Sequence, residues 1–167
     1  MAARGNERFV EDAAARGIVV QAIVFPEGTK TSADAARAIG CTVAQIAKSV
    51  VLVADSEVVV AITSGVNRVD TTKVAAIFGA TTVRTAKPDE VRAATGYAIG
   101  GVPPFAHAQP LRCLLDAELL AFEEVWGAAG APDTCFPINP QRLVEMPGVT
   151  LADVKQRSSE DGPAGGG

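Results

Sequence analysis

The sequence predicts one α+β domain in which short helices cover a mixed, curved and barrel-like β-sheet. Runs rich in β-branched residues alternate with short segments of helical periodicity, and most of these segments end at a glycine. Of the 167 residues, 48% are apolar and 20% are charged, which is typical of a globular chain long enough to bury one core. We therefore expect a single domain over residues 1–157 and a disordered tail over residues 158–167.

Three elements are expected at the start of the chain. Apolar residues at helical spacing predict a helix at 4–15, which ends before Gly17. The β-branched run at 18–25 predicts a strand. Thr31 as N-cap, followed by an acidic first turn, predicts a helix that ends at Gly40.

A β-hairpin is the next predicted element. Residues 46–54 and 58–63 have strand composition and flank the turn Asp55-Ser56-Glu57. Asp70 then caps a helix that ends at Gly79. The remaining expected elements are strands at 81–84, 112–115, 118–122 and 134–138 and helices at 89–95 and 140–144.

Composition argues against several classes of protein. No apolar run approaches the roughly 20 residues that span a bilayer, and the N-terminus lacks the apolar core of a signal peptide, so we expect a cytoplasmic protein without membrane contact. Cys41, Cys113 and Cys135 are far apart, and with one histidine they support neither a disulfide framework nor a metal site; small buried residues are expected instead. No nucleotide-binding or calcium-binding motif is present, so we expect no cofactor.

Charge is distributed unevenly along the chain. The net charge is −4, yet basic residues outnumber acidic ones between residues 30 and 92 and are outnumbered after that. A dedicated DNA-binding surface normally gives a high pI, so DNA is not expected as a partner. An anionic partner is expected to bind locally, in the more basic part of the chain.

The strongest candidate for a functional site is the segment Gly100-Gly101-Val102-Pro103-Pro104-Phe105-Ala106-His107. Glycine allows close backbone approach and positive φ, whereas proline fixes φ and donates no hydrogen bond, so the segment predicts a rigid loop that binds through main-chain groups. His107 lies in no recognised nucleophile motif, so it either supports the loop or acts as a general base.

Two further candidates carry positive charge. Lys48 shares a strand face with apolar side chains, so its ammonium either reaches water or lies at the floor of a cleft, ready for a phosphate or a polarised oxygen. Ser64 and Gly65 precede a helix start at which Arg68 and Lys73 add charge for an anion. The alternative for this second stretch is an ordinary capped connection.

These motifs occur in an order that resembles the YbaK/prolyl-tRNA synthetase-associated domain family. The segments that carry the resemblance are Thr31-Ser32-Ala33-Asp34-Ala35-Ala36, Gln45-Ile46-Ala47-Lys48-Ser49-Val50-Val51, Arg68-Val69-Asp70-Thr71-Thr72-Lys73 and Gly100-Gly101-Val102-Pro103-Pro104-Phe105. The resemblance covers residues 9–149, and its most specific part is the lysine together with the Gly-x-x-x-Pro loop. It implies a freestanding deacylase that edits mischarged aminoacyl-tRNA and so serves translation fidelity.

The resemblance also implies roles for individual residues. Lys48 would be the essential lysine that holds the 3′-terminal nucleotide of tRNA, while the loop from Gly100 to Pro104 grips the amino acid near the ester. We expect the N–H groups around Gly101 and Val102 to stabilise the oxyanion while water attacks with help from the ribose 2′-OH. The expected catalytic residues are Lys48, Gly100, Gly101, Val102 and Pro104, and the expected substrate-binding residues are Ser64, Gly65, Arg68, Lys73, Pro103, Phe105 and His107.

One residue departs from the pattern of the family. Many similar members read Phe-Gly-His after the prolines, whereas this chain has Phe105-Ala106-His107. A positive φ at Ala106 would therefore strain the end of the loop.

The implied substrate is the 3′ end of tRNA(Pro) or a related tRNA carrying a small amino acid such as Ala, Cys, Ser or Thr. The domain would act in trans, with a synthetase or an elongation factor as a partner that lends affinity. Two other classes stay open: a non-catalytic binding or regulatory module of the same fold associated with a synthetase, and an esterase for other small activated acyl compounds.

Overall fold

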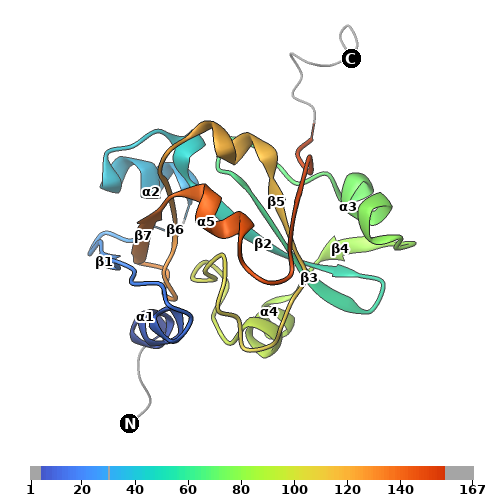
Figure 1. Ribbon diagram of the computed structural model, residues 1–167, viewed down its shortest axis with the longest axis horizontal. Helices are drawn as coiled ribbons and strands as arrows, with labels where there is room; N and C mark the ends of the chain where they lie inside the picture. The colour runs from blue at the N-terminus through green and yellow to red at the C-terminus, as the bar shows by residue number, and fades with distance from the viewer. Residues whose placement is uncertain (1–4, 30, 157–167) are drawn as a thin grey trace, which may run out of the picture.

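The structure, a computed structural model, describes residues 5–29 and 31–156. Its strands form a larger sheet with the order β4-β2-β3-β5-β8 and a smaller one with the order β1-β7-β6 (Figure 1). In chain order the strands are β1 Ile23–Val24, β2 Ala47–Ala54, β3 Glu57–Ser64, β4 Val83–Thr85, β5 Cys113–Asp116, β6 Val125–Ala128, β7 Thr134–Ile138 and β8 Val149–Ala152.

β2 and β3 form a long antiparallel hairpin that pairs along the whole length of both strands (Figure 1). Its turn contains Asp55 at φ 55°, a backbone region that aspartate tolerates better than most residues. The Asp55 carboxylate accepts hydrogen bonds from the N–H groups of Thr81 and Thr82, just before β4. The predicted hairpin is confirmed.

The larger sheet is mixed. β3 and β5 run parallel, as do β5 and β8, whereas β2 is antiparallel to both β3 and β4. A bridge between Ile46 and Trp126 connects the start of β2 to β6 of the smaller sheet. The predicted α+β class with a mixed sheet is confirmed, although the described strands lie in two connected open sheets that do not close into a barrel.

Short helices lie around the two sheets (Figure 1). They are α1 Gly5–Ala15, α2 Ser32–Ile39, α3 Thr71–Phe78, α4 Pro88–Thr95 and α5 Pro140–Val144, with the 3-10 helices η1 Val43–Gln45 and η2 Ala117–Ala121. Side-chain oxygens of Thr31 and Asp70 cap α2 and α3, and Gly40 and Gly79 end these helices in the left-handed conformation, as the sequence predicts.

Apolar side chains cover both faces of the larger sheet. Val51 of β2 belongs to the main cluster, which includes the rings of Phe9, Phe105 and Phe136 at centroid separations of 4.9 to 6.0 Å. Leu52 points to the other face, into a cluster covered by α3. The Gly-Pro loop, residues 100–104, is thus continued by Phe105 into the main core.

The predicted strands at 118–122 and 18–25 need correction. The first is wrong: this stretch lies largely in η2, because the Asp116 side chain accepts the Glu118 N–H and starts a helical turn. The second is reduced to the two residues of β1, because β7 pairs only with Ile23 and Val24. β6, β8 and η1 are elements that the sequence patterns do not predict. The expected tail at 158–167 lies outside the described residues, and the domain limits 1–157 stay a prediction.

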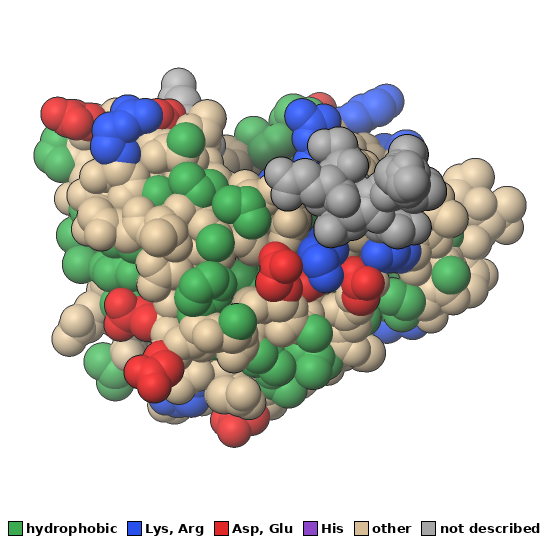
Figure 2. All heavy atoms as spheres, turned by 90° about the horizontal axis from the view of Figure 1, so that it is seen from above, with side chains coloured by type: hydrophobic (Ala, Val, Ile, Leu, Met, Phe, Trp, Pro, Cys, Tyr) green, Lys and Arg blue, Asp and Glu red, His purple; other side chains and the backbone are tan. Residues whose placement is uncertain are grey.

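The face shown in Figure 2 carries acidic and basic side chains interspersed with small groups of apolar ones. Cys113 and Cys135 are buried as expected, while Cys41 is partly exposed, and all three are free thiols. Among the described helices, none is both long and apolar enough to cross a bilayer.

Candidate functional site at the edge of β2

A cavity of about 320 Å³, the edge cavity, lies where β2 begins. Four parts of the chain form its wall: the start of α2, the start of β2, the Gly-Pro loop, and β6 with β7. The lining residues are Thr29, Thr31, Ser32, Ala35, Ile46, Ala47, Lys48, Ser49, Gly100, Val102, Trp126, Gly127, Ala128 and Cys135.

The pairing of β2 explains why space is left at this point. β3 covers one edge of β2 completely, whereas β4 pairs only with the end of the other edge. Trp126 bridges to Ile46 just before the strand. Between these two contacts no described strand pairs with β2, and the edge cavity opens there beside Lys48 and Ser49.

Lys48 lies opposite Thr63 of β3, so the two side chains project from the same face of the hairpin. The Thr63 hydroxyl is buried and has no hydrogen-bond partner among the described residues. Burial lowers the pKa of Lys48 below its ordinary value of 10.5, and the positive charge of Arg68 lowers it further. Lys48 is therefore a cation held in an environment that disfavours its charge.

Arg68 is exposed and close enough for its charge to act on Lys48. In the part of the chain that the structure describes, no carboxylate forms an ion pair with either cation. Two neighbouring cations without a carboxylate favour an anionic ligand, and phosphate is one anion that such side chains recognise.

The start of α2 adds to this positive potential. Thr31 Oγ1 accepts the Asp34 N–H at 3.0 Å and so caps the helix. Thr31 and Ser32 both line the edge cavity, so the N-terminal end of α2 borders it. The partial positive charge of a helix N-terminus lies there beside Lys48.

Gly101 holds the Gly-Pro loop in place. Its N–H donates to the carbonyl of Ala98 and its own carbonyl accepts the N–H of Gly130, both at 2.9 Å. A Cβ at Gly101 would lie 2.9 Å from the Cα and N of Ala131, so only glycine fits. Gly101 does not line the edge cavity, and its N–H is already used.

Gly100 and Val102 are the loop residues that face the edge cavity. Gly100 has φ 88°, which places its backbone in the left-handed region. Neither its N–H nor that of Val102 donates a hydrogen bond within the described residues. These two groups are the main-chain donors that the loop leaves for a ligand.

Pro103, Pro104 and His107 form the body of the loop. Pro104 packs against Gly127, where an added Cβ would lie 3.2 Å from its ring. His107 Nε2 donates to the carbonyl of Pro103 at 2.8 Å, because a carbonyl can only accept. Burial lowers the pKa of His107, the contact with Pro103 partly offsets this, and Arg16 lowers it again. This hydrogen bond ties the mostly buried imidazole to the loop, and the choice between support and general base stays a prediction.

Ala106 has φ 67° and is buried in the main cluster. This is the left-handed region, which costs a residue with a Cβ about 1–2 kcal/mol. The strain expected at the position where similar proteins have glycine is therefore present.

The remaining predicted site residues lie outside the edge cavity. Ser64 Oγ donates to the carbonyl of Ala44 at 2.8 Å, and the Gly65 N–H donates to the carbonyl of Ile46. Both residues therefore hold the segment that leads into β2. Lys73 of α3 contacts the Asp153 carboxylate at 3.1 Å and donates to the Lys155 carbonyl at 2.8 Å, so its ammonium is already paired.

The structure thus brings Lys48 together with Gly100 and Val102, with Arg68 nearby. Phe105 belongs to the aromatic core, and with Pro104 and His107 it borders a different cavity behind the loop.

Sequence reasoning missed several residues of the edge cavity. Thr31 and Ser32 were readable as a helix start, but nothing in the sequence ties that helix to Lys48. Trp126 and Cys135 carry no motif, and they reach the site only because β6 and β7 pair beside β2. Among the described residues, no cluster of three or more His, Cys, Asp or Glu side chains is suited to a metal ion.

Known proteins resemble this chain over most of its length. Residues 26–146 match the model of the aminoacyl-tRNA editing domain. The uncharacterised protein YwhH of Bacillus subtilis is 32% identical over 73% of this chain and 78% of its own length. A proline–tRNA ligase of Xanthomonas oryzae is 29% identical over 92% of this chain, which spans 27% of the ligase.

A crystal structure of a proposed trans-editing enzyme for prolyl-tRNA synthetase has the same fold. It is 37% identical, with a TM-score of 0.87 over 94% of this chain and 100% of that one. The match to the family model covers well over half of the chain and includes Lys48 and the Gly-Pro loop. This chain belongs to the aminoacyl-tRNA editing domain family, as its sequence motifs predict.

Proposed function

We propose that this domain removes a wrongly attached small amino acid from tRNA by hydrolysing the aminoacyl ester. Water adds to the ester carbonyl, the bond to the ribose oxygen breaks, and the products are the free amino acid and the tRNA 3′ hydroxyl. One observation carries the proposal: Lys48 and the Gly-Pro loop, far apart in the sequence, line one cavity.

Lys48 holds the terminal nucleotide in this proposal. Its ammonium lies beside the cavity with the charge of Arg68 nearby and no ion-pairing carboxylate among the described residues. An anionic phosphate would relieve the repulsion between the two cations. Lys48 and Arg68 are therefore assigned to the 3′-terminal phosphate and its neighbours, and the partial charge of α2 favours the same anion.

The Gly-Pro loop stabilises the tetrahedral oxyanion in this proposal. The Gly101 N–H is bound to Ala98, so this role passes to the N–H groups of Val102 and Gly100. Main-chain donors held by a rigid loop stabilise developing charge without reorganising during the reaction.

Water is the proposed nucleophile, activated with help from the ribose 2′-OH. Burial raises the pKa of Cys135, which lines the cavity, so its thiol is a poor nucleophile at neutral pH. Ser49 also lines the cavity, but the only histidine of the chain, His107, is bound to Pro103 and does not line it. An activated ester needs mainly positioning, which the cavity supplies.

The proposed substrates carry Ala, Cys, Ser or Thr on tRNA(Pro) or a related tRNA. The similarity to part of a proline–tRNA ligase supports this choice, and the modest volume of the cavity, about 320 Å³, favours a small side chain beside the ribose. The domain would act in trans in the cytoplasm, where tRNA is charged, with a synthetase or an elongation factor increasing its affinity.

A panel of mischarged tRNAs tests the proposal. Wild type should deacylate at least one small aminoacyl-tRNA, Lys48→Ala should lose about 100-fold in kcat/KM while keeping its fold, and the exposed Lys87→Ala should behave as wild type. Full activity of Lys48→Ala would overturn the mechanism. Equal turnover of small acyl esters without tRNA would indicate a general esterase, and turnover of none would indicate a binding module.

A further inference from the structure

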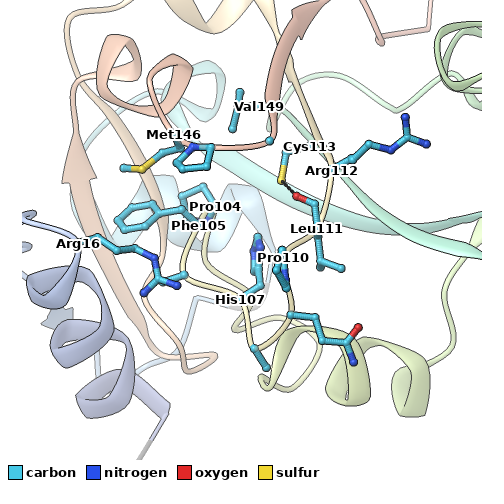
Figure 3. A pocket seen from close by; sticks show the side chains of 15 residues that line it. Arg16, Pro104, Phe105, His107, Pro110, Leu111, Arg112, Cys113, Met146 and Val149 are labelled. Atoms are coloured by element: carbon cyan, nitrogen blue, oxygen red, sulfur yellow. Dashed lines mark hydrogen bonds between the residues drawn. The ribbon is translucent and has the colours of Figure 1, made fainter.

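A second cavity, the rear cavity, has a volume of about 400 Å³ and lies behind the Gly-Pro loop (Figure 3). Residues 104–107 form one wall, and residues 108–113 and 146–149 form others. Arg16 reaches toward it from the end of α1 (Figure 3). Lys48, Gly100 and Val102, which line the edge cavity, do not line the rear cavity, so it is a separate space.

The body of the rear cavity is apolar. The side chains that line it include Pro104, Phe105, Leu111, Met146 and Val149 (Figure 3). A cavity of this size and lining takes a ligand with a small hydrocarbon body. Each methylene that leaves water for such a space strengthens binding.

The charged residues that line the rear cavity are basic. Its lining residues include Arg16 and Arg112 but no aspartate or glutamate. Arg112 is already paired with Glu57 through two contacts of 2.6 and 2.8 Å. The Arg16 guanidinium donates to the main-chain carbonyl of Asp12, and no carboxylate in the described ranges forms an ion pair with it.

Arg16 also acts on the inner wall of this space. Its charge contributes to lowering the pKa of His107, which lines the same cavity. Arg16 is exposed, so its guanidinium lies where the rear cavity meets solvent, within range of the His107 imidazole that Pro103 holds. In a chain with a net charge of −4, this is a local positive site over an apolar floor.

We infer that the rear cavity binds a small amphiphilic carboxylate, with its hydrocarbon chain against Phe105 and Met146 and its carboxylate on the Arg16 guanidinium. An arginine fork matches a carboxylate with two parallel hydrogen bonds. The ligand would contact residues 104–107, which end and follow the Gly-Pro loop. By mass action it would stabilise the conformation of these residues that it binds. This inference stands whether or not the domain hydrolyses aminoacyl-tRNA.

Titration of the full chain with hexanoate tests the inference by calorimetry and by chemical shifts. Wild type should bind hexanoate saturably and with one site, and acetate, which has the charge without the chain, should not bind. Arg16→Gln should lower the affinity for hexanoate at least about fivefold, because a hydrogen bond to a charged group is lost. The exposed Arg92→Gln is the matched control and should bind as wild type does.

Two further measurements separate charge from cavity. Hexanamide should bind wild type and Arg16→Gln equally and more weakly than hexanoate binds wild type. Val149→Phe should abolish binding of both hexanoate and hexanamide, because the larger side chain fills the rear cavity. If circular dichroism shows that Val149→Phe is unfolded, Leu111→Phe is tested in its place. The inference is overturned if hexanoate does not saturate, if Arg16→Gln binds it as tightly as wild type, or if acetate binds equally well.

Discussion

The carbonyl of Gly101 accepts the N–H of Gly130 at 2.9 Å, which joins the Gly-Pro loop to the turn between β6 and β7. The same turn lies 2.9 Å from where a Cβ of Gly101 would be, at the backbone of Ala131. The loop is therefore positioned by main-chain contact with the strands that form the other side of the edge cavity. Gly101 affects the site by fixing the position of the loop, whereas Gly100 and Val102 line the edge cavity.

Gly101→Ala should displace the loop. The added methyl meets backbone atoms, which cannot rotate away, so we expect a loss of about 1–3 kcal/mol in the free energy of unfolding. A shift of the loop should also lower kcat/KM for deacylation by about tenfold or more. Urea denaturation and steady-state kinetics on one preparation measure both effects.

The control for Gly101→Ala is Gly79→Ala, at the end of α3. Gly79 has φ 67° and nothing within 4 Å of its added Cβ, so this variant should lose about 1–2 kcal/mol and keep its activity. If Gly101→Ala kept both wild-type stability and wild-type kcat/KM, the positioning role would be wrong.

Substitutions at Ala106 should reveal the strain at the end of the loop. The free energy of unfolding of Ala106→Gly should stay within about 1 kcal/mol of wild type. Glycine relieves the backbone strain at φ 67°, but it raises the entropy of the unfolded chain and removes one buried methyl group. Ala106→Val should lose more than about 2 kcal/mol, since a β-branched residue is disfavoured at this φ and the site is buried. Thermal or urea unfolding measures these changes, with the exposed Ala93→Val as control. A Val variant as stable as wild type would contradict the observed backbone.

The pKa of Lys48 predicts how ligand binding depends on pH. It is lowered by burial and then by Arg68, so Lys48 loses its proton below its ordinary 10.5, and affinity for a stable amide analogue of aminoacyl-adenosine monophosphate should fall as pH rises toward that value. Arg68→Gln removes a like charge, raises the Lys48 pKa and should move the decline to higher pH. Titrations between pH 7 and 10 measure this, and the ligand's own amine titrates equally in both proteins. If affinity fell at the same pH in wild type and in Arg68→Gln, the electrostatic coupling between Arg68 and Lys48 would be contradicted.

The same shift predicts the stability of Lys48→Met. A lysine whose folded-state pKa lies below its unfolded value destabilises the folded protein at low pH, and this effect disappears as pH rises through the folded pKa toward 10.5. The apolar variant should be at least as stable as wild type at pH 7, and the advantage should shrink by pH 10. Urea denaturation at both pH values checks this, and a large loss of stability in Lys48→Met would contradict it.

Local chemistry is what made much of the fold predictable. Thr31 and Asp70 cap their helices with side-chain oxygens, and the glycines after them end those helices, because both effects act within a few residues. The pairing of β3 with β5 and of β5 with β8 is parallel and joins distant segments, so no local pattern reports it.

The site divides in the same way. The sequence by itself determined that Lys48 is a cation on an apolar strand and that residues 100–104 form a rigid glycine-proline loop, because residue type and alternation decide both. Only the tertiary structure decided that these two share one cavity, that the Gly101 N–H donates to Ala98, and that His107 is hydrogen-bonded to Pro103. Those relationships depend on the bridge from Ile46 to Trp126 and on the contact of Gly101 with Ala131, which are packing events between segments far apart in the chain.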